Sequence, residues 1–338
     1  MKAIKFFAIS AMAAAMITSC SSEDELSQSN YPSDNIIRVT AGVNNAKTRA
    51  EGAGTEMKND FSLTIVNKNA PKYTYTDKVF SKKSGDWACS ETLLWQKSDA
   101  LVDIVAFAPA QTGKFNGVYA EGSIQPITYS VASDQSTSSD NNDLLYYYAP
   151  GFNPGTSLDE KGKLSIQFNH AFCMIDINVT LGTEFNKPEV LKESPIVKVT
   201  LGGTKIAANV DVTNAASVVT ASEEAAATDI TTTKGSFTPA ENADKKADPE
   251  VNAISRFSCI AIPQTVAANT FKVSLMTAGK RYEWTSAEPV VLKSGYRYTL
   301  NLSMGNDVVL LKGGSDNGGI TATPWTEGDT GLKPLETE

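Results

Sequence analysis

The residue with the clearest chemistry is Cys20, which follows a short apolar segment at the start of the chain. Two lysines precede that segment, which covers residues 6–17 and is too short to span a bilayer as a helix. Small residues then lead directly to the cysteine. This order is typical of a bacterial lipoprotein signal, in which the peptide is cut before the cysteine and acyl chains are attached to it. Residues 1–19 are therefore predicted to be a signal peptide and Cys20 the lipidated residue.

Acyl chains at Cys20 would hold the exported protein on a membrane. Each buried methylene group contributes about 0.8 kcal/mol, so two or more chains give a stable anchor where a single chain would be marginal. The alternative is an ordinary secretory signal that happens to be followed by a cysteine. Both readings predict export. No later apolar run approaches the length of a transmembrane helix, so the lipid is the expected membrane attachment.

Other residues offer little for catalysis or for metal binding. The chain has a single histidine, His170, which excludes sites that need two, and no nucleophile motif accompanies it. Phosphate-binding and dinucleotide-binding glycine motifs, the zinc motif H-E-x-x-H and the EF-hand loop are all absent from the sequence. The acidic loop 140–143 is read as a solvated turn in preference to a calcium site. The sequence thus predicts a protein that is not an enzyme, with no catalytic residues, no metal and no cofactor.

Cysteine usage and charge further narrow the range of possible functions. Cys89, Cys173 and Cys259 are odd in number and widely spaced, so we read them as small buried hydrophobes, not as a disulfide framework. The formal net charge of -8 argues against nucleic acid as a partner. With 338 residues, of which 41% are hydrophobic, the chain can bury a sizeable core and is long enough for two domains.

From residue 36 onward, many segments of the chain show the two-residue period of β-strands. In 36–43, Ile37, Val39, Ala41 and Val43 alternate with Arg38, Thr40 and Gly42, which places one apolar face on a strand. Turn signals separate the predicted strands, and no long helical pattern lies between them. Further strands are predicted at 61–66, 101–108, 124–131, 164–181, 197–201, 255–262, 270–278, 281–285 and 296–304. We therefore expect an all-β fold of two β-sandwiches in tandem.

Two segments depart from simple alternation. In 164–181 both faces are apolar through the middle, which predicts one central strand that is covered on both sides. His170 interrupts one of these faces and is read as a hydrogen-bonded histidine of the core or its rim. Residues 214–252 have few large apolar side chains, and we expect them to form a long surface excursion.

Several short segments, taken together and in this order, resemble the fimbrillin-like proteins of Bacteroidetes. Each is weak alone, but the resemblance covers most of residues 36–326 and comes with the lipoprotein signal. The segments are Trp95, 102–109, 143–146, 164–171, 262–265, 292–298 and Trp325.

The resemblance implies a type V pilin built of two transthyretin-like β-sandwich domains, at 50–182 and 183–338. Such pilins are lipidated and carried to the outer surface of the outer membrane. An arginine-specific protease then removes the N-terminal segment, here 20–49, together with its first strand. The opened groove accepts a strand from another pilin subunit, so the subunits form a fimbrium that supports adhesion. An unpaired strand edge that accepts a strand from a partner is the general basis of β-augmentation.

Arg49 is the expected processing site. The chain has five arginines against 25 lysines, and Arg49 lies in a stretch of small residues and glycines that should be an accessible loop. That loop directly follows the strand at 36–43. A cut between Arg49 and Ala50 would release the strand together with the lipid. The alternative is that Arg49 is an ordinary loop residue and the protein stays anchored.

The C-terminal region is the candidate source of the donated strand. Two short β-prone runs, 308–311 and 320–323, are flanked by glycine-rich sequence and include Val308, Leu310, Ile320 and Ala322. They would serve as donor strands, or they would close the second domain of their own chain. The sequence leaves both readings open.

The competing functional class is a surface lipoprotein that binds glycans for a nutrient-uptake system. It depends on exposed aromatic residues that could stack on sugar rings, such as Trp87 or the run Tyr146, Tyr147 and Tyr148. Core packing accounts for such residues more often than ligand binding does. A polymer ladder would favour the pilin, and glycan affinity of a monomer would favour this alternative.

Overall fold

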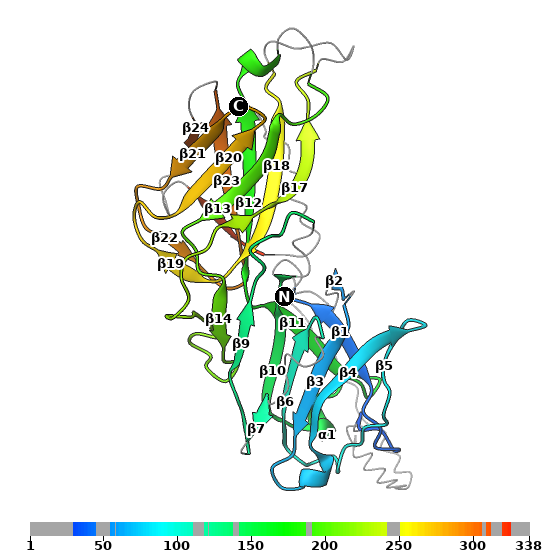
Figure 1. Ribbon diagram of the computed structural model, residues 1–338. Coiled ribbons are helices and arrows are strands. Elements are labelled where there is room, and N and C mark those ends of the chain that lie inside the picture. Colours follow the sequence, from blue (N-terminus) through cyan, green and yellow to red (C-terminus); the bar gives the residue numbers. More distant parts are fainter. Residues whose placement is uncertain are drawn as a thin grey trace, which may run out of the picture.

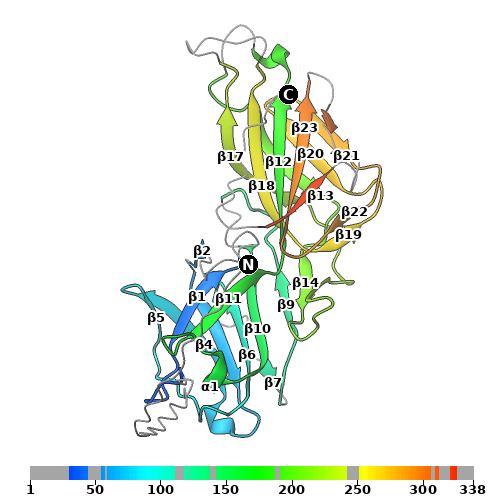
Figure 2. The same ribbon diagram turned by 180° about the vertical axis from the view of Figure 1, so that it is seen from behind.

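The computed structural model describes residues 30–44, 55–57, 59–110, 118–120, 122–137, 142–186, 191–241, 251–305, 309–311 and 320–325. These residues form an all-β fold, as predicted, with α1 (Pro154–Ser157), η1 (Pro71–Tyr73) and η3 (Thr183–Asn186) as short helical turns. Figures 1 and 2 show two lobes stacked end to end. We call them the N-terminal lobe, with most strands before residue 171, and the C-terminal lobe, with most strands after it.

The N-terminal lobe is built on one sheet that closes on itself. Along the sheet the order is β11-β10-β6-β3-β4-β5-β1-β2, and β1 also pairs with β11. The first strand thus joins the two ends of the sheet. The strands are β1 (Val39–Val43), β2 (Thr55–Glu56), β3 (Phe61–Val66), β4 (Tyr75–Lys83), β5 (Asp86–Cys89), β6 (Val102–Ala108), β10 (Leu145–Phe152) and β11 (Leu164–His170).

The closed sheet surrounds the N-terminal core, to which residues of most of its strands contribute. Phe61, Leu63 and Ile65 of β3 are all buried in it. Strand β6 is covered on both faces, because Ile104 belongs to this core whereas Val105 belongs to the core of the other lobe. A strand buried on both faces has a nearly continuous apolar sequence, as β6 does.

The C-terminal lobe is built mainly on two sheets. The larger has the order β17-β18-β12-β23-β24, with β25 also paired to β23, and the smaller has the order β16-β13-β20-β21. The strands of the larger sheet are β12 (Cys173–Leu181), β17 (Thr233–Thr238), β18 (Ile254–Ala261), β23 (Tyr296–Met304), β24 (Val309–Leu311) and β25 (Thr321–Pro324). Those of the smaller sheet are β13 (Ile196–Gly202), β16 (Ile230–Thr231), β20 (Lys272–Thr277) and β21 (Arg281–Thr285).

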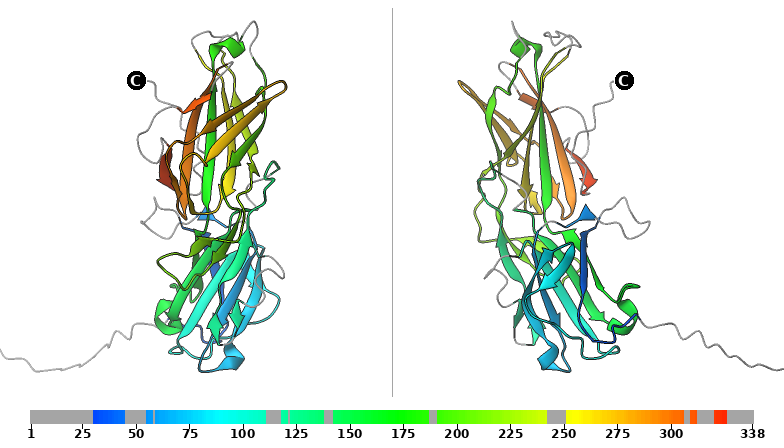
Figure 3. Two further views of the ribbon diagram at one scale, coloured as in Figure 1. Left: turned by 60° about the vertical axis from the view of Figure 1, so that its left-hand side comes forward. Right: turned by 90° about the vertical axis from the view of Figure 1, so that its right-hand side faces the viewer.

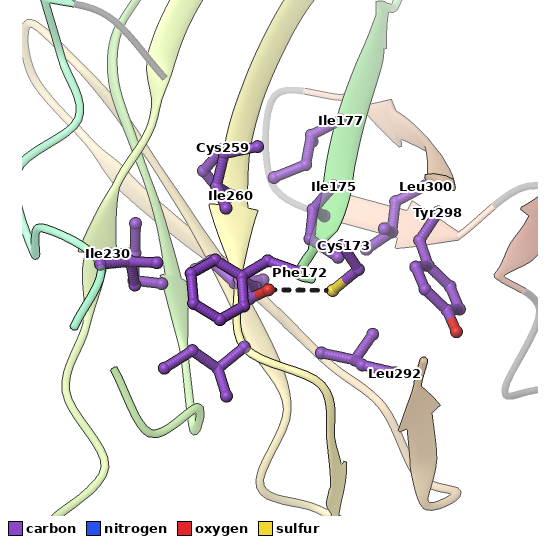
Figure 4. Close-up of a cluster of buried hydrophobic side chains, with 14 of the residues drawn as sticks. Phe172, Cys173, Ile175, Ile177, Ile230, Cys259, Ile260, Leu292, Tyr298 and Leu300 are labelled. Atoms are coloured by element: carbon purple, nitrogen blue, oxygen red, sulfur yellow. Dashed lines mark hydrogen bonds between the residues drawn. The ribbon is translucent and has the colours of Figure 1, made fainter. Parts of the chain in front are cut away.

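The core of the C-terminal lobe is centred on β12. Every second residue of this strand, from Cys173 to Leu181, is fully buried, and the residues between them are partly exposed. Figure 4 shows Ile175 and Ile177 of β12 beside Leu300 of β23 in this core. Strand β12 pairs antiparallel with β18 and parallel with β23, so it is an interior strand of its sheet.

A further, three-stranded sheet joins the lobes. Strand β9 (Ile127–Ser130), from the N-terminal half, pairs with β14 (Ala207–Val210), which pairs with β15 (Val219–Ala221). Buried residues of both halves, among them Phe107 and Phe172, belong to one continuous core. The lobes are therefore packed against each other. Two further pairs are β7 (Tyr119–Ala120) with β8 (Ser123–Ile124), and β19 (Gln264–Val266) with β22 (Val290–Leu292).

The prediction of one central strand over 164–181 was wrong. The segment forms β11 and β12, which lie in different sheets and are separated by Ala171 and Phe172. Even-numbered residues of β11 face the N-terminal core, whereas odd-numbered residues of β12 face the other core. Because the core-facing residues change from even-numbered to odd-numbered positions, the segment resembles one strand that is apolar on both faces. The domain boundary placed between residues 182 and 183 stays a prediction; the sheets change at 171–172.

The expected surface excursion at 214–252 also contains strands. β15, β16 and β17 all start and end within it, and they pair with β14, β13 and β18 respectively. These strands are short or largely exposed, so they need few large apolar side chains.

Candidate functional site

The first strand lies with its predicted apolar face on the N-terminal core. Ile37, Val39 and Val43 are 6%, 3% and 4% exposed, and Ala41 is partly buried against the same core. The chain is strand-paired over Val39–Val43, and Ile36 forms a further bridge with Leu94. The side chains singled out from the sequence are thus part of the interior of the lobe.

Main-chain hydrogen bonds hold this strand on both edges. On one edge β1 runs parallel to β11, with Val39 beside Leu164 and Val43 beside Phe168. On the other edge the amide of Ile37 donates to the carbonyl of Leu93 at 2.9 Å. Strand β1 therefore occupies a slot whose two walls would each lose hydrogen-bond partners if it left.

The ring of Phe61 contacts two aromatic residues, each of which pairs with one end of β1. Val39 is paired with Trp87 and Val43 with Phe168. The centroid of the Phe61 ring is 5.0 Å from that of Trp87 and 5.5 Å from that of Phe168. Aromatic side chains thus lie next to the partners of the first strand. Figure 3 shows β1 in blue in the N-terminal lobe.

The arginines in the described part of the chain all belong to ordered strands or their immediate flanks. Arg256, Arg281 and Arg297 lie within β18, β21 and β23. The carbonyl of Arg38 accepts a hydrogen bond from the amide of Leu164 at 2.8 Å. The predicted processing residues Arg49 and Ala50, like the predicted lipidation residue Cys20, lie outside the described residues.

Arg38 also fixes the start of the first strand through Asp34. Its guanidinium donates to both carboxylate oxygens of Asp34, at 3.0 and 2.6 Å. Because of this pair, and because the amide of Ile36 donates to the same carboxylate, the pKa of Asp34 is lowered to about 2. The pair is exposed to solvent, so its contribution to stability is modest.

The C-terminal segments lie on the edge of β23 in their own chain. Val309–Leu311 pairs with Leu302–Met304, and Thr321–Pro324 pairs with Tyr296–Thr299. Leu310 is 58% exposed, Ile320 is 3% exposed, and Ala322 is exposed. Val308 lies outside the described residues. Figure 3 shows β25, in red, beside β23, in orange.

Trp325, just beyond β25, contacts the only histidine in the chain. Its ring stacks on that of His170, with the centroids 3.7 Å apart and the planes at 11°. Nδ1 of His170 is 2.7 Å from a carboxylate oxygen of Asp143. His170 ends β11, so the stack joins the C-terminal segment to the strand that pairs with β1. Sequence inspection placed His170 in a core or rim but did not reveal this contact.

The described residues offer no metal centre. They contain no group of three or more His, Cys, Asp or Glu side chains that could hold a metal ion. Burial raises the pKa of the Cys173 and Cys259 thiols, which keeps them protonated and unreactive. Within the same residues, no helix has the length and apolar character needed to cross a membrane.

The aromatic residues considered for glycan stacking are engaged in packing. Tyr146 and Tyr148 pack against the core shared by the lobes, and Tyr147 packs against the N-terminal core. Trp87 contacts Phe61 edge to face. The packing of these side chains accounts for their presence without a sugar ligand.

Comparisons with known proteins agree with this architecture. The family model described as fimbrillin-like matches residues 48–325. A search of curated proteins gave no match.

Among solved structures, similar folds occur in proteins of Bacteroides species. A candidate cell adhesion protein from Bacteroides ovatus has a TM-score of 0.59 at 15% identity, covering 86% of this chain and 97% of that one. A second, from Bacteroides uniformis, has a TM-score of 0.55 at 13% identity, covering 87% and 100% of the two chains. A fimbrial protein from Bacteroides vulgatus has a TM-score of 0.53 at 14% identity, covering 86% and 99%. At these identities the likeness concerns the fold.

Proposed function

The chain belongs to the fimbrillin-like family, and we propose that it is a pilin: a structural subunit of a surface fimbria that supports adhesion. In this proposal each lobe is a transthyretin-like β-sandwich, and subunits are joined by exchange of strands. The observation that carries the proposal is the position of β1. Together with Ile37 just before it, it contributes three buried side chains to a core, yet it is the first strand that the structure describes and it precedes Arg49 in the sequence.

Delivery to the surface begins with the signal peptide and with acylation of Cys20. The lipid would hold the precursor at the outer membrane while β1 still fills its slot. Replacement of Cys20 by Ala should give an unacylated protein that does not reach the outer surface. Normal membrane partitioning and surface display of that variant would contradict this step.

Cleavage between Arg49 and Ala50 would then separate β1 and the lipid from the rest of the chain. The described arginines support this choice of site, because each has its backbone in a strand or hydrogen-bonded to one. Proteases cut exposed segments that lack such pairing. Of the five arginines, Arg49 is the one in a run of small residues between strands.

Loss of β1 would leave a marginally stable subunit with an exposed apolar groove. Uncovering the sites of Ile37, Val39 and Val43 costs roughly 1.5–3 kcal/mol for each side chain, in addition to the lost main-chain partners of β11. A strand from a second subunit would restore both contributions. The segments around Leu310 and Ile320 to Ala322 are the proposed donors, since they are short edge strands with exposed residues.

The decisive experiment compares wild type with Arg49→Lys, which keeps the positive charge but removes the arginine specificity. Wild type recovered from cells should begin at Ala50 and form a ladder on an unheated denaturing gel. Arg49→Lys should retain the acylated Cys20 and run as a monomer. Arg281→Lys, a matched change on the exposed strand β21, should behave as wild type. A ladder of wild-type yield from Arg49→Lys would refute the proposal.

A further inference from the structure

Strand β11 depends on β1 for most of its main-chain pairing. Five residues of β11, Leu164 to Phe168, are in register with β1 on one edge. On the other edge β11 is paired with β10 at two residues, Asn169 and His170. The side-chain amide of Asn44, directly after β1, also donates to Asn169 at 2.8 Å. If β1 left, β11 would keep its strand partner at its last two residues alone.

Those last residues of β11 support the C-terminal segment. The His170 side chain is 2% exposed and lies between Asp143, which fixes its orientation, and the ring of Trp325. Trp325 is 7% exposed, and its amide donates to the carbonyl of Gly295 at 2.7 Å. The amide of Gly295 in turn donates to Phe172, two residues after β11 ends.

The C-terminal segment itself has few anchors. The four residues of β25 are all exposed and pair with β23 through the backbone. In the described stretch 320–325, Ile320 and Trp325 are the buried residues, one before the strand and one after it. A segment with exposed side chains and two terminal anchors is easily opened when one anchor is lost.

We propose that β11 and the stack of His170 on Trp325 couple the two ends of the chain, so that loss of β1 loosens β25 from β23. This inference rests on the proposed function. An uncleaved subunit would hold its groove filled and its candidate donor strand latched. Cleavage would open the groove and, through β11, release the latch. The candidate donor strand β25 is thus released at the stage when the groove of the same subunit is open to accept a strand from another.

The coupling is reciprocal, because two linked equilibria must affect each other by the same factor. If β1 stabilises the Trp325 anchor, then the anchor stabilises β1. Weakening the stack in the uncleaved protein should therefore loosen both β25 and β1. This requirement separates a true coupling from two independent openings that happen to follow cleavage.

The test is hydrogen–deuterium exchange of the soluble chain without signal peptide and Cys20, before and after cleavage at Arg49, on the gel-filtered monomer. Mass spectrometry follows release of the N-terminal fragment. Amides of 164–168 report on loss of β1, and the amides of 321–323 and 325 report on the latch, since Pro324 has none. Cleavage should accelerate exchange at 321–325 by about fivefold or more, the lower end of usual coupling factors. Amides of β18, in the same lobe, should change little.

Outcomes separate this inference from the proposed function. Faster exchange at 164–168 with no change at 321–325 would overturn the coupling and leave the proposed function standing. Retention of the fragment with no change in either segment would show that cleavage does not remove β1, which would overturn both. This comparison uses the wild-type chain, so it does not depend on the folding of a variant.

A variant pair tests the role of the stack. Trp325→Ala in the uncleaved chain should already show fast exchange at 321–325, faster exchange at 164–168, and little further change at 321–325 on cleavage. Trp284→Ala is the matched control, because Trp284 is partly buried on β21 against Phe271. It should keep the wild-type response to cleavage. An undiminished response in Trp325→Ala would show that the stack does not carry the coupling.

Discussion

The first strands of the two lobes occupy the same topological position but are held very differently. β1 runs parallel to β11, the last strand of its lobe, and β12 runs parallel to β23, the last long strand of the other. On its second edge β12 has eight residues in register with β18. β1 has one residue in register with β5 and two with β2 on its second edge.

The connections of the two strands reinforce the contrast. β12 follows β11 after the two buried residues Ala171 and Phe172, so it is fixed at its start by the junction of the lobes. β1 is the first strand among the described residues. The two equivalent strands thus differ in role. β12 is a permanent central strand, whereas β1 is suited to removal. The predictions below compare matched changes in the two strands.

The largest effect is expected in β12. Ile177→Ala removes a fully buried side chain at the centre of the C-terminal core. The free energy of unfolding should fall by about 4 kcal/mol, toward the upper part of the usual range, because both flanking strands restrict collapse of the cavity. Denaturant unfolding should show this loss equally in the precursor and in the chain cleaved at Arg49. A loss confined to the precursor would contradict the permanent role of β12.

A smaller effect is expected from the ion pair beside β12. Arg297 on β23 binds Asp176 on β12, and their side chains are 12% and 14% exposed. Arg297→Met should lower the free energy of unfolding by about 3 kcal/mol, because it leaves a mostly buried carboxylate without its cation. The double variant Arg297→Met with Asp176→Leu should recover much of the loss. Failure to recover any stability would mean that packing, and not the unpaired charge, explains the cost.

Ile37→Ala is the matched change beside β1. The side chain is slightly more exposed than that of Ile177 and lies two residues before β1, so the precursor should lose about 2 kcal/mol. The cleaved chain lacks the residue, so its unfolding should be unaffected. The precursor of this variant should also release its N-terminal fragment faster after cleavage. An equal loss in precursor and cleaved chain would show that the fragment stays in place.

The sequence predicted strands best where one face is buried and the other is wet. β21 and β23 are of this kind and have the bounds expected from alternation. β3 also has its expected bounds, although all six of its residues are buried. β10 was missed although it lies inside the N-terminal sheet. Its tyrosines pack on both cores, so no alternation is visible. β4 was missed for the opposite reason, since most of its residues are partly or fully exposed.

The candidate site was predictable in its local parts but not in its long-range contacts. The apolar face of Ile37, Val39 and Val43 followed from the two-residue period alone. The stack of Trp325 on His170 joins residues that are far apart in sequence, and no local pattern encodes which core an aromatic ring will enter. After Phe168 the regularly spaced apolar residues change from even-numbered to odd-numbered positions. This change is visible in the sequence and signals the break between β11 and β12 once two sheets are considered.

The smallest expected effect concerns the exposed ion pair at the start of β1. The pKa of Asp34 is lowered to about 2 in the folded protein from an ordinary value of 3.8. Its stabilising contribution is therefore fully present above about pH 4 and is lost as the pH falls toward 2. Asp34→Asn should slightly speed the departure of the N-terminal fragment from the cleaved chain at pH 6. The difference from wild type should shrink as the pH is lowered through this window.

Arg38→Gln provides the control for this comparison, because it removes the other partner of the same pair. The double variant Asp34→Asn with Arg38→Gln should differ little from either single variant if the pair acts as a unit. Release rates measured by mass spectrometry at pH 6, 4 and 3 would establish the pattern. A difference between Asp34→Asn and wild type that persists unchanged down to pH 3 would assign the effect to the turn around Ile36. The exposed pair would then contribute nothing to the retention of β1, and the hold on this strand would rest on its three buried side chains and its pairing with β11.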